Sequence, residues 1–206
     1  HAGPLFLIDI AAETTLLILG EGDYELFSVH PNRGRIAALD TSAVAASGAF
    51  DENLYQQGKL QLFDPITGEI VISLPLRLAR DPWSFMPPNY APDGAHLIVN
   101  VEGGLGVVDT QTGTLQVVPL ENTCLAEKDC WWTDYLPIYW LPDSHSFFTA
   151  QSVNDYFDER AETTLSRVTL GAEGLIETVA IIHANMLSFS PDRHFLASSN
   201  QPDIEQ

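Results

Sequence analysis

The residues best suited to chemistry are aromatic and charged side chains gathered in four polar segments. These segments are 43–58, 76–88, 119–136 and 151–163. Aromatic rings beside carboxylates suit stacking on a sugar ring, holding a cationic group or anchoring a protein partner. We therefore predict a binding site built from Tyr55, Arg80, Trp131, Trp132, Asp134, Asp155, Tyr156, Phe157 and Asp158.

Catalytic signatures are missing from the sequence. It contains no Gly-x-Ser-x-Gly, no His-Glu-x-x-His and no glycine loop that cradles phosphate. This favours a binding protein and leaves enzymatic activity open. The acidic run 154–159 offers the oxygen ligands that Ca²⁺ takes, but its spacing matches no calcium-binding loop known to us. We interpret it as a solvated acidic loop and expect no metal or other cofactor.

The two cysteines, Cys124 and Cys130, lie six positions apart in a polar stretch. A disulfide between them would close a small ring and stabilise the fold by roughly 2 kcal/mol. Two free thiols are the alternative, while one cysteine pair without nearby histidine falls short of the four ligands of a zinc site. A disulfide, together with a first residue that is His1 rather than Met, favours an extracytoplasmic location: secreted, periplasmic or on the cell surface.

The charge of the chain excludes several partners. There are 28 acidic and 9 basic residues, for a net charge of −19. Such a chain repels the phosphates of nucleic acids and of anionic membranes. The most apolar stretch, residues 4–19, carries Asp9 and Glu13 and is too short for a transmembrane helix. We expect no nucleic-acid partner and no membrane insertion.

Two apolar patterns alternate along the chain and must position the polar segments. The first surrounds a tight turn that contains proline, at 25–39, 89–100, 139–150 and 187–199. The second surrounds a turn rich in Gly, Thr, Asp or Glu, at 5–19, 60–74, 105–118 and 166–181. Short β-rich segments on either side of such turns predict β-hairpins. No window shows a sustained helical period, so helix should be scarce.

Two hairpins in each repeat of about 50 residues make four antiparallel strands, here named a to d. This is the blade of a β-propeller. A β-sandwich is the alternative, but it does not predict two kinds of turn in strict alternation. The segments SPDRHFLASS and APDGAHLIVN resemble the Ser-Pro-Asp-Gly signature of TolB-like, WD-related propellers. The resemblance implies the fold and says almost nothing about function.

The repeats predict one all-β domain over residues 1–206. It starts with a c–d half blade at 1–20 and ends with an a–b half blade at 185–206, with blades at 24–76, 83–120 and 134–182 between them. The two halves are complementary, which favours closure into a four-bladed ring. Self-association through the halves and an arc of a larger propeller are the alternatives.

The polar segments should all lie at one end of the blades. In a four-stranded up-and-down sheet, the a–b and c–d turns lie at one end and the b–c and d–a connections at the other. Every predicted site residue falls in a connection of the second kind, and long loops on a rigid scaffold commonly carry binding sites. We therefore predict a non-catalytic module that recognises a protein, peptide or glycan. The alternative is the propeller part of a secreted hydrolase resembling prolyl oligopeptidase.

Overall fold

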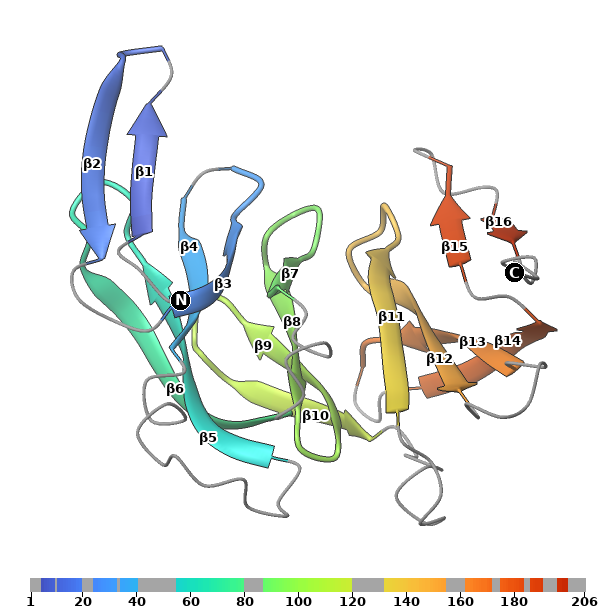
Figure 1. Ribbon diagram of the computed structural model, residues 1–206. Coiled ribbons are helices and arrows are strands. Elements are labelled where there is room, and N and C mark those ends of the chain that lie inside the picture. The colour runs from blue at the N-terminus through green and yellow to red at the C-terminus, as the bar shows by residue number, and fades with distance from the viewer. Residues whose placement is uncertain are drawn as a thin grey trace, which may run out of the picture. The chain divides into compact units, whose positions relative to one another are not determined.

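The computed structural model is all-β, since every regular element among the residues that it describes is a strand (Figure 1). The structure describes residues 5–9, 11–19, 24–32, 34–40, 55–79, 87–119, 132–154, 162–171, 175–183, 186–190 and 196–199. The strands form three four-stranded and two two-stranded antiparallel sheets. The chain divides into two compact units, residues 1–120 and 121–206.

The first unit contains one hairpin and two four-stranded sheets (Figure 1). The hairpin pairs β1 (Leu5–Asp9) with β2 (Thr14–Leu19). The next sheet has the order β3 (Tyr24–Val29), β4 (Ile36–Asp40), β5 (Tyr55–Phe63), β6 (Ile70–Ala79). The third has the order β7 (Asn89–Tyr90), β8 (His96–Val101), β9 (Gly104–Asp109), β10 (Leu115–Pro119).

The second unit contains one four-stranded sheet and one hairpin. The sheet has the order β11 (Trp132–Trp140), β12 (Ser146–Asn154), β13 (Glu162–Thr169), β14 (Leu175–His183). The hairpin pairs β15 (Met186–Phe189) with β16 (Leu196–Ser199). In all three large sheets neighbouring strands are consecutive in the chain, which is the up-and-down order of a propeller blade.

The a–b turns carry an aspartate that organises the backbone. Asp93 Oδ1 accepts a hydrogen bond from the backbone N–H two residues further along the chain, and Asp143 Oδ1 does the same in its turn. Both bonds are 2.9 Å long. The residue after each aspartate has a positive φ, 74° at Gly94 and 57° at Ser144. Ser144 therefore adopts a left-handed conformation that glycine adopts at lower cost.

The c–d turns share a different arrangement, in which an aspartate begins the turn and a glycine ends it. Oδ1 of Asp64 and of Asp109 accepts from the backbone N–H groups two and three residues on, at 2.7 to 3.0 Å. Gly68 and Gly113 end these turns, each with a φ of 72°. In the β1–β2 turn, Glu13 stands at the same position with a φ of 52°. Here a side chain occupies a backbone conformation that favours glycine.

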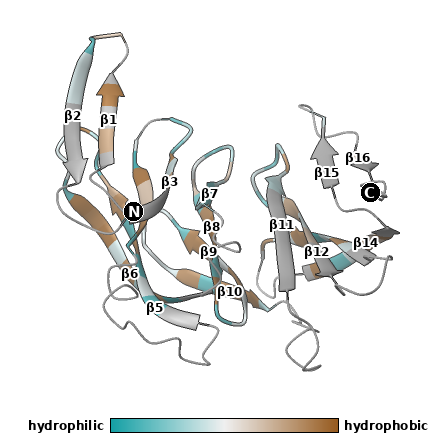
Figure 2. Ribbon diagram, in the orientation of Figure 1, coloured by the Kyte–Doolittle hydropathy of each residue, from teal (hydrophilic) through white to brown (hydrophobic). Residues whose placement is uncertain are grey.

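The core of the first unit lies between its two four-stranded sheets. One face of β3–β6 and one face of β7–β10 supply it, with Ala37, Leu39, Leu60, Leu62 and Leu76 from the first and Tyr90, Leu97, Val99, Val101 and Val108 from the second. Strand β6 lies against β8, and β3 lies against β7. Hydrophobic residues are concentrated in these strands (Figure 2). The two sheets therefore pack face to face.

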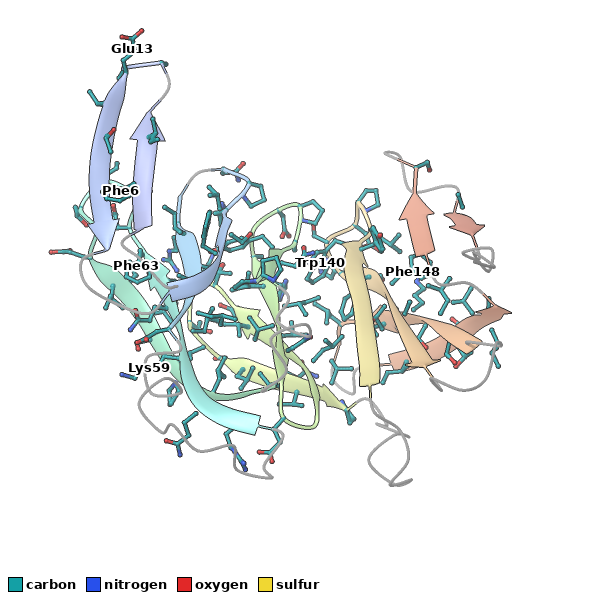
Figure 3. All side chains as sticks on the ribbon, viewed as in Figure 1. Phe6, Glu13, Lys59, Phe63, Trp140 and Phe148 are labelled. Carbon is teal, nitrogen blue, oxygen red and sulfur yellow. The ribbon has the colours of Figure 1, made fainter. Side chains whose placement is uncertain are left out.

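The sheet of the second unit has its own buried row. Trp140, labelled in Figure 3, lies on β11 and pairs with Phe147 on β12. Their rings meet edge-on with centroids 5.2 Å apart. Phe147 in turn pairs with Val168 on β13, and both are 0% exposed. This row ties the first three strands together near the a–b turn.

Candidate functional site

Long connections are anchored at one end of the sheets, which we call the long-loop rim. Successive connections of an up-and-down antiparallel sheet alternate between its two ends. The a–b and c–d turns therefore share the short-turn end. The residues that flank the connections 41–54, 80–88, 120–131 and 155–161 lie at the opposite end.

The second unit brings two predicted groups of site residues to one end of one sheet. Trp132, the first residue of β11, pairs with Asn154, the last residue of β12, and Asp134 pairs with Ser152. Asn154 directly precedes the segment 155–158. The register therefore anchors both groups at the same rim. Of the predicted residues in this unit, Trp131, Asp155, Tyr156, Phe157 and Asp158 lie outside the described residues.

The first unit carries the other two predicted residues. Tyr55 opens β5 and pairs with Ala79, the last residue of β6. Arg80 follows Ala79 and lies outside the described residues. The register thus places Tyr55 beside the start of the connection that contains Arg80. The predicted site accordingly has one part on each unit.

Three of the predicted residues were expected in loops, and that expectation is wrong. Tyr55 belongs to β5, and Trp132 and Asp134 belong to β11. The β5–β6 ladder continues through Tyr55, beyond the last β4–β5 pair at Asp40 and Lys59. Backbone pairing satisfies the N–H and C=O groups of these polar stretches, so the strands run further than the apolar pattern predicts.

An ion pair links the two sheets of the first unit at the rim. Arg77 Nη1 on β6 lies 2.8 Å from Oε2 of Glu102, in the turn between β8 and β9. The Glu102 N–H also donates to the Arg77 carbonyl oxygen at 2.8 Å. Gly103 completes this two-residue turn with a φ of 86°. The rim therefore offers both signs of charge beside a tight b–c turn.

Other predicted features lie mostly outside the described residues. This is the case for Cys124 and Cys130, whose disulfide stays a prediction. Within the described ranges, no group of three or more His, Cys, Asp or Glu residues has the arrangement of a metal site. The same ranges contain no helix long and apolar enough to span a membrane.

A polar group at the short-turn end was missed by the sequence analysis. Arg35 Nη1 donates to the Thr110 carbonyl oxygen of the neighbouring sheet, and Thr110 Oγ1 donates to the Gly94 carbonyl oxygen at 2.7 Å. His30 lies against the ring of Tyr90 in the same place. The available signal was that Arg35 is one of only nine basic residues and that it sits in a turn.

Tyr90 is the buried member of this group. It is 8% exposed, and its hydroxyl has no hydrogen-bond partner among the residues that the structure describes. Burial raises the pKa of Tyr90, and the Arg35 guanidinium opposes the rise. The hydroxyl therefore stays protonated at physiological pH.

Comparison with known proteins identifies a fold. No protein-family model and no curated protein matches the sequence. A protein assigned as a 6-phosphogluconolactonase from Bacteroides uniformis is similar in structure, with a TM-score of 0.52 and 13% identity over 96% of this chain and 57% of that chain. Acylaminoacyl peptidase from Pyrococcus horikoshii has a TM-score of 0.51 and 13% identity over 80% of this chain and 25% of that chain.

These likenesses concern the fold alone, because the identities are low. The similar structures are of propeller fold, and the present chain spans 57% and 25% of their lengths. The four-stranded sheets described here have the up-and-down order of antiparallel strands that is typical of a propeller blade. The chain has a β-propeller fold, as its repeats predict.

Proposed function

We propose that this chain is a non-catalytic β-propeller module of TolB-like or WD-related type, located outside the cytoplasm, that binds a protein, peptide or glycan through its long-loop rim. The observation that carries the proposal is the register of β11 and β12. Trp132 pairs with Asn154, so the segments 131–134 and 155–158 are anchored at the same end of one sheet. A contact surface that combines aromatic rings and carboxylates is thereby supported.

The chemistry of these segments favours a particular ligand class. Within 131–134 and 155–158 the chain carries aromatic rings and three carboxylates, and the net charge of the chain is −19. Rings that stack on sugars or on cations, beside groups that accept hydrogen bonds, suit a glycan or a basic peptide. A ligand that carries phosphate is disfavoured by the same charge.

Screening the protein against a glycan array and a library of basic peptides tests the proposal. A ligand found there should bind less tightly to the Trp132→Ala variant. Ile66→Ala is the matched control, because Ile66 is 84% exposed in the β5–β6 turn at the short-turn end. If both variants lose ligand affinity equally, or if neither loses any, binding at the long-loop rim is contradicted.

A second candidate is the propeller part of a secreted hydrolase. The observation behind it is that the chain spans 25% of the length of an acylaminoacyl peptidase that shares its fold. In that case the catalytic residues would lie in another part of a longer protein. A fluorophosphonate probe that labels serine hydrolases, applied to the full-length natural protein, separates the two candidates. Labelling supports the hydrolase, and absence of labelling supports the binding module.

A further inference from the structure

His30 joins the two sheets of the first unit at their short-turn end. It precedes Pro31 in the a–b turn between β3 and β4, where the other repeats carry Ala91, Leu141 and Ser190. Its ring lies edge-on against Tyr90 of β7, with centroids 5.2 Å apart and planes at 68°. It also covers Gly94, where an added Cβ would overlap the imidazole. His30 of the first four-stranded blade thus covers the a–b turn of the second.

A hydrogen bond defines which ring nitrogen carries the proton. The Asn32 N–H donates to His30 Nδ1 at 3.0 Å. A nitrogen that accepts a hydrogen bond bears no proton, so the neutral imidazole carries its proton on Nε2. The imidazolium form bears protons on both nitrogens. Protonation would therefore set the Nδ1 proton against the Asn32 N–H and break this bond.

The groups around the His30 imidazole determine what a second proton on the ring would do. Arg35, from the same turn, supplies a fixed positive charge and reaches across to the Thr110 carbonyl oxygen. Tyr90, from β7, presents a buried phenol that stays neutral. Asp93 precedes Gly94 in the facing turn, where its carboxylate accepts the Ala95 N–H. An imidazolium would repel the Arg35 guanidinium, and the Asp93 carboxylate that could balance its charge is engaged with the Ala95 N–H.

We propose that His30 is a proton-responsive latch between the first two blades. The neutral imidazole accepts the Asn32 N–H and lies on Gly94, which closes the short-turn end of the blade interface. The imidazolium loses that bond and releases the contact. Imidazole is the side chain that ordinarily changes charge between about pH 5 and 8. The latch lies at the end opposite to the long-loop rim and does not depend on the function proposed there.

Hydrogen–deuterium exchange of the whole chain tests the latch. Amide exchange in peptides covering 30–36 and 91–97 is compared at about pH 7.5 and 5.5, after correction for intrinsic rates. The parent protein should exchange several-fold faster in both peptides at the lower pH. His30→Phe keeps a ring over Gly94 but takes up no proton, so its corrected exchange should not change with pH. A peptide covering 64–69, in the c–d turn of the first blade, is the internal reference.

Two further variants keep the test decisive. His96 begins β8 within the second peptide, so His96→Gln should retain the pH response if His30 is responsible. Gly94→Ala displaces the ring and should exchange faster at both pH values. The proposal is overturned if the parent shows no pH response, if His30→Phe keeps the response, or if His96→Gln abolishes it.

Discussion

Arg77 and Glu102 are joined twice across the boundary between neighbouring sheets. Their charged groups lie 2.8 Å apart, and the Glu102 N–H donates to the Arg77 carbonyl oxygen at the same distance. The side chains are 48% and 44% exposed, so water screens the ion pair. The backbone bond does not depend on the side chains. At the rim the two sheets are therefore linked by backbone as well as by charge.

Replacing Arg77 by Ala should lower the free energy of unfolding by no more than about 1 kcal/mol. High salt should shrink the difference, because ions screen exposed charges. Urea unfolding at two salt concentrations measures both effects. Glu102→Ala removes the other partner of the same ion pair and should lower the free energy of unfolding by about as much. A several-fold larger loss from either variant would mean that the pair is not exposed in solution.

Glu13→Gly should stabilise the protein by about 0.5 to 1 kcal/mol, because glycine adopts the positive φ of this position without strain. Glycine already stands at the same position of the next two c–d turns, at Gly68 and Gly113. Thermal unfolding measures the change. Glu69→Gly is the control, since Glu69 is not among the residues with a positive φ and a glycine there adds only chain entropy. A destabilised Glu13→Gly protein would contradict the prediction.

The turns were predictable because local chemistry determines them. The segments 64–68 and 109–113 are near copies in sequence, and their aspartates accept the same pair of backbone N–H groups. An aspartate that binds the following amides and a glycine at positive φ specify such a turn without tertiary contacts. The order of the strands then follows from the alternation of the two kinds of turn.

Contacts between repeats were not predictable in the same way. His30 and Gly94 belong to different repeats, and nothing near either residue indicates that one covers the other. The length of β5 and β11 was missed because Tyr55 and Trp132 stand in polar stretches. There, pairing of the backbone determines the strand, and the side-chain pattern carries little signal.

Stability should fall in acid as the c–d turns lose their charge. The backbone N–H of Thr112, with that of Gln111, holds the pKa of Asp109 below its ordinary value of 3.8. A lowered pKa in the folded state contributes stability above the unfolded value, and this is lost as the pH falls through the folded pKa. Asp109→Asn keeps the acceptor oxygen but has no charge to lose.

The free energy of unfolding of Asp109→Asn should therefore lie below that of the parent at pH 7 and approach it below pH 3.8. Urea titrations across this range measure the gap. The equivalent variant Asp64→Asn should show the same pH dependence of the free energy of unfolding. The reason is that the Thr67 and Ile66 N–H groups lower the pKa of Asp64 in the same way. If the difference in the free energy of unfolding between variant and parent does not change with pH, the charge of the turn carboxylates does not account for that difference.

Trp132→Ala should weaken ligand binding by about 2 kcal/mol or more, as expected for an aromatic anchor at the centre of an interface. Unfolding should change little, since Trp132 is the first residue of β11. Isothermal titration calorimetry and thermal unfolding measure the two effects. A variant that melts far below the parent would show that Trp132 belongs to the core, and the predicted binding role would then fail.

The β1–β2 hairpin and strand β3 each expose a residue whose counterparts in later sheets are buried. Ile8, just before the β1–β2 turn, is 61% exposed, whereas Phe63 and Val108 at the same position are 0% exposed. Val29, the last residue of β3, is 47% exposed, whereas Tyr90 at the end of β7 is 8% exposed. Positions that are buried in later sheets are therefore exposed in β1 and in β3. We expect further apolar surface to cover them.

Deleting residues 1–19 should unfold or aggregate the protein if the β1–β2 hairpin is half of a completed blade. The hairpin would then share a sheet with an a–b hairpin, and its loss would leave apolar faces and strand edges bare. Size-exclusion chromatography with light scattering and thermal unfolding, with the parent and Glu13→Gly as references, measure the outcome. A truncated chain that stays monomeric, soluble and as stable as the parent would contradict completion of a blade at the N-terminus. The chain would then be better described as an arc of a larger propeller, in which β1–β2 adds little to the packing of the sheets that follow it.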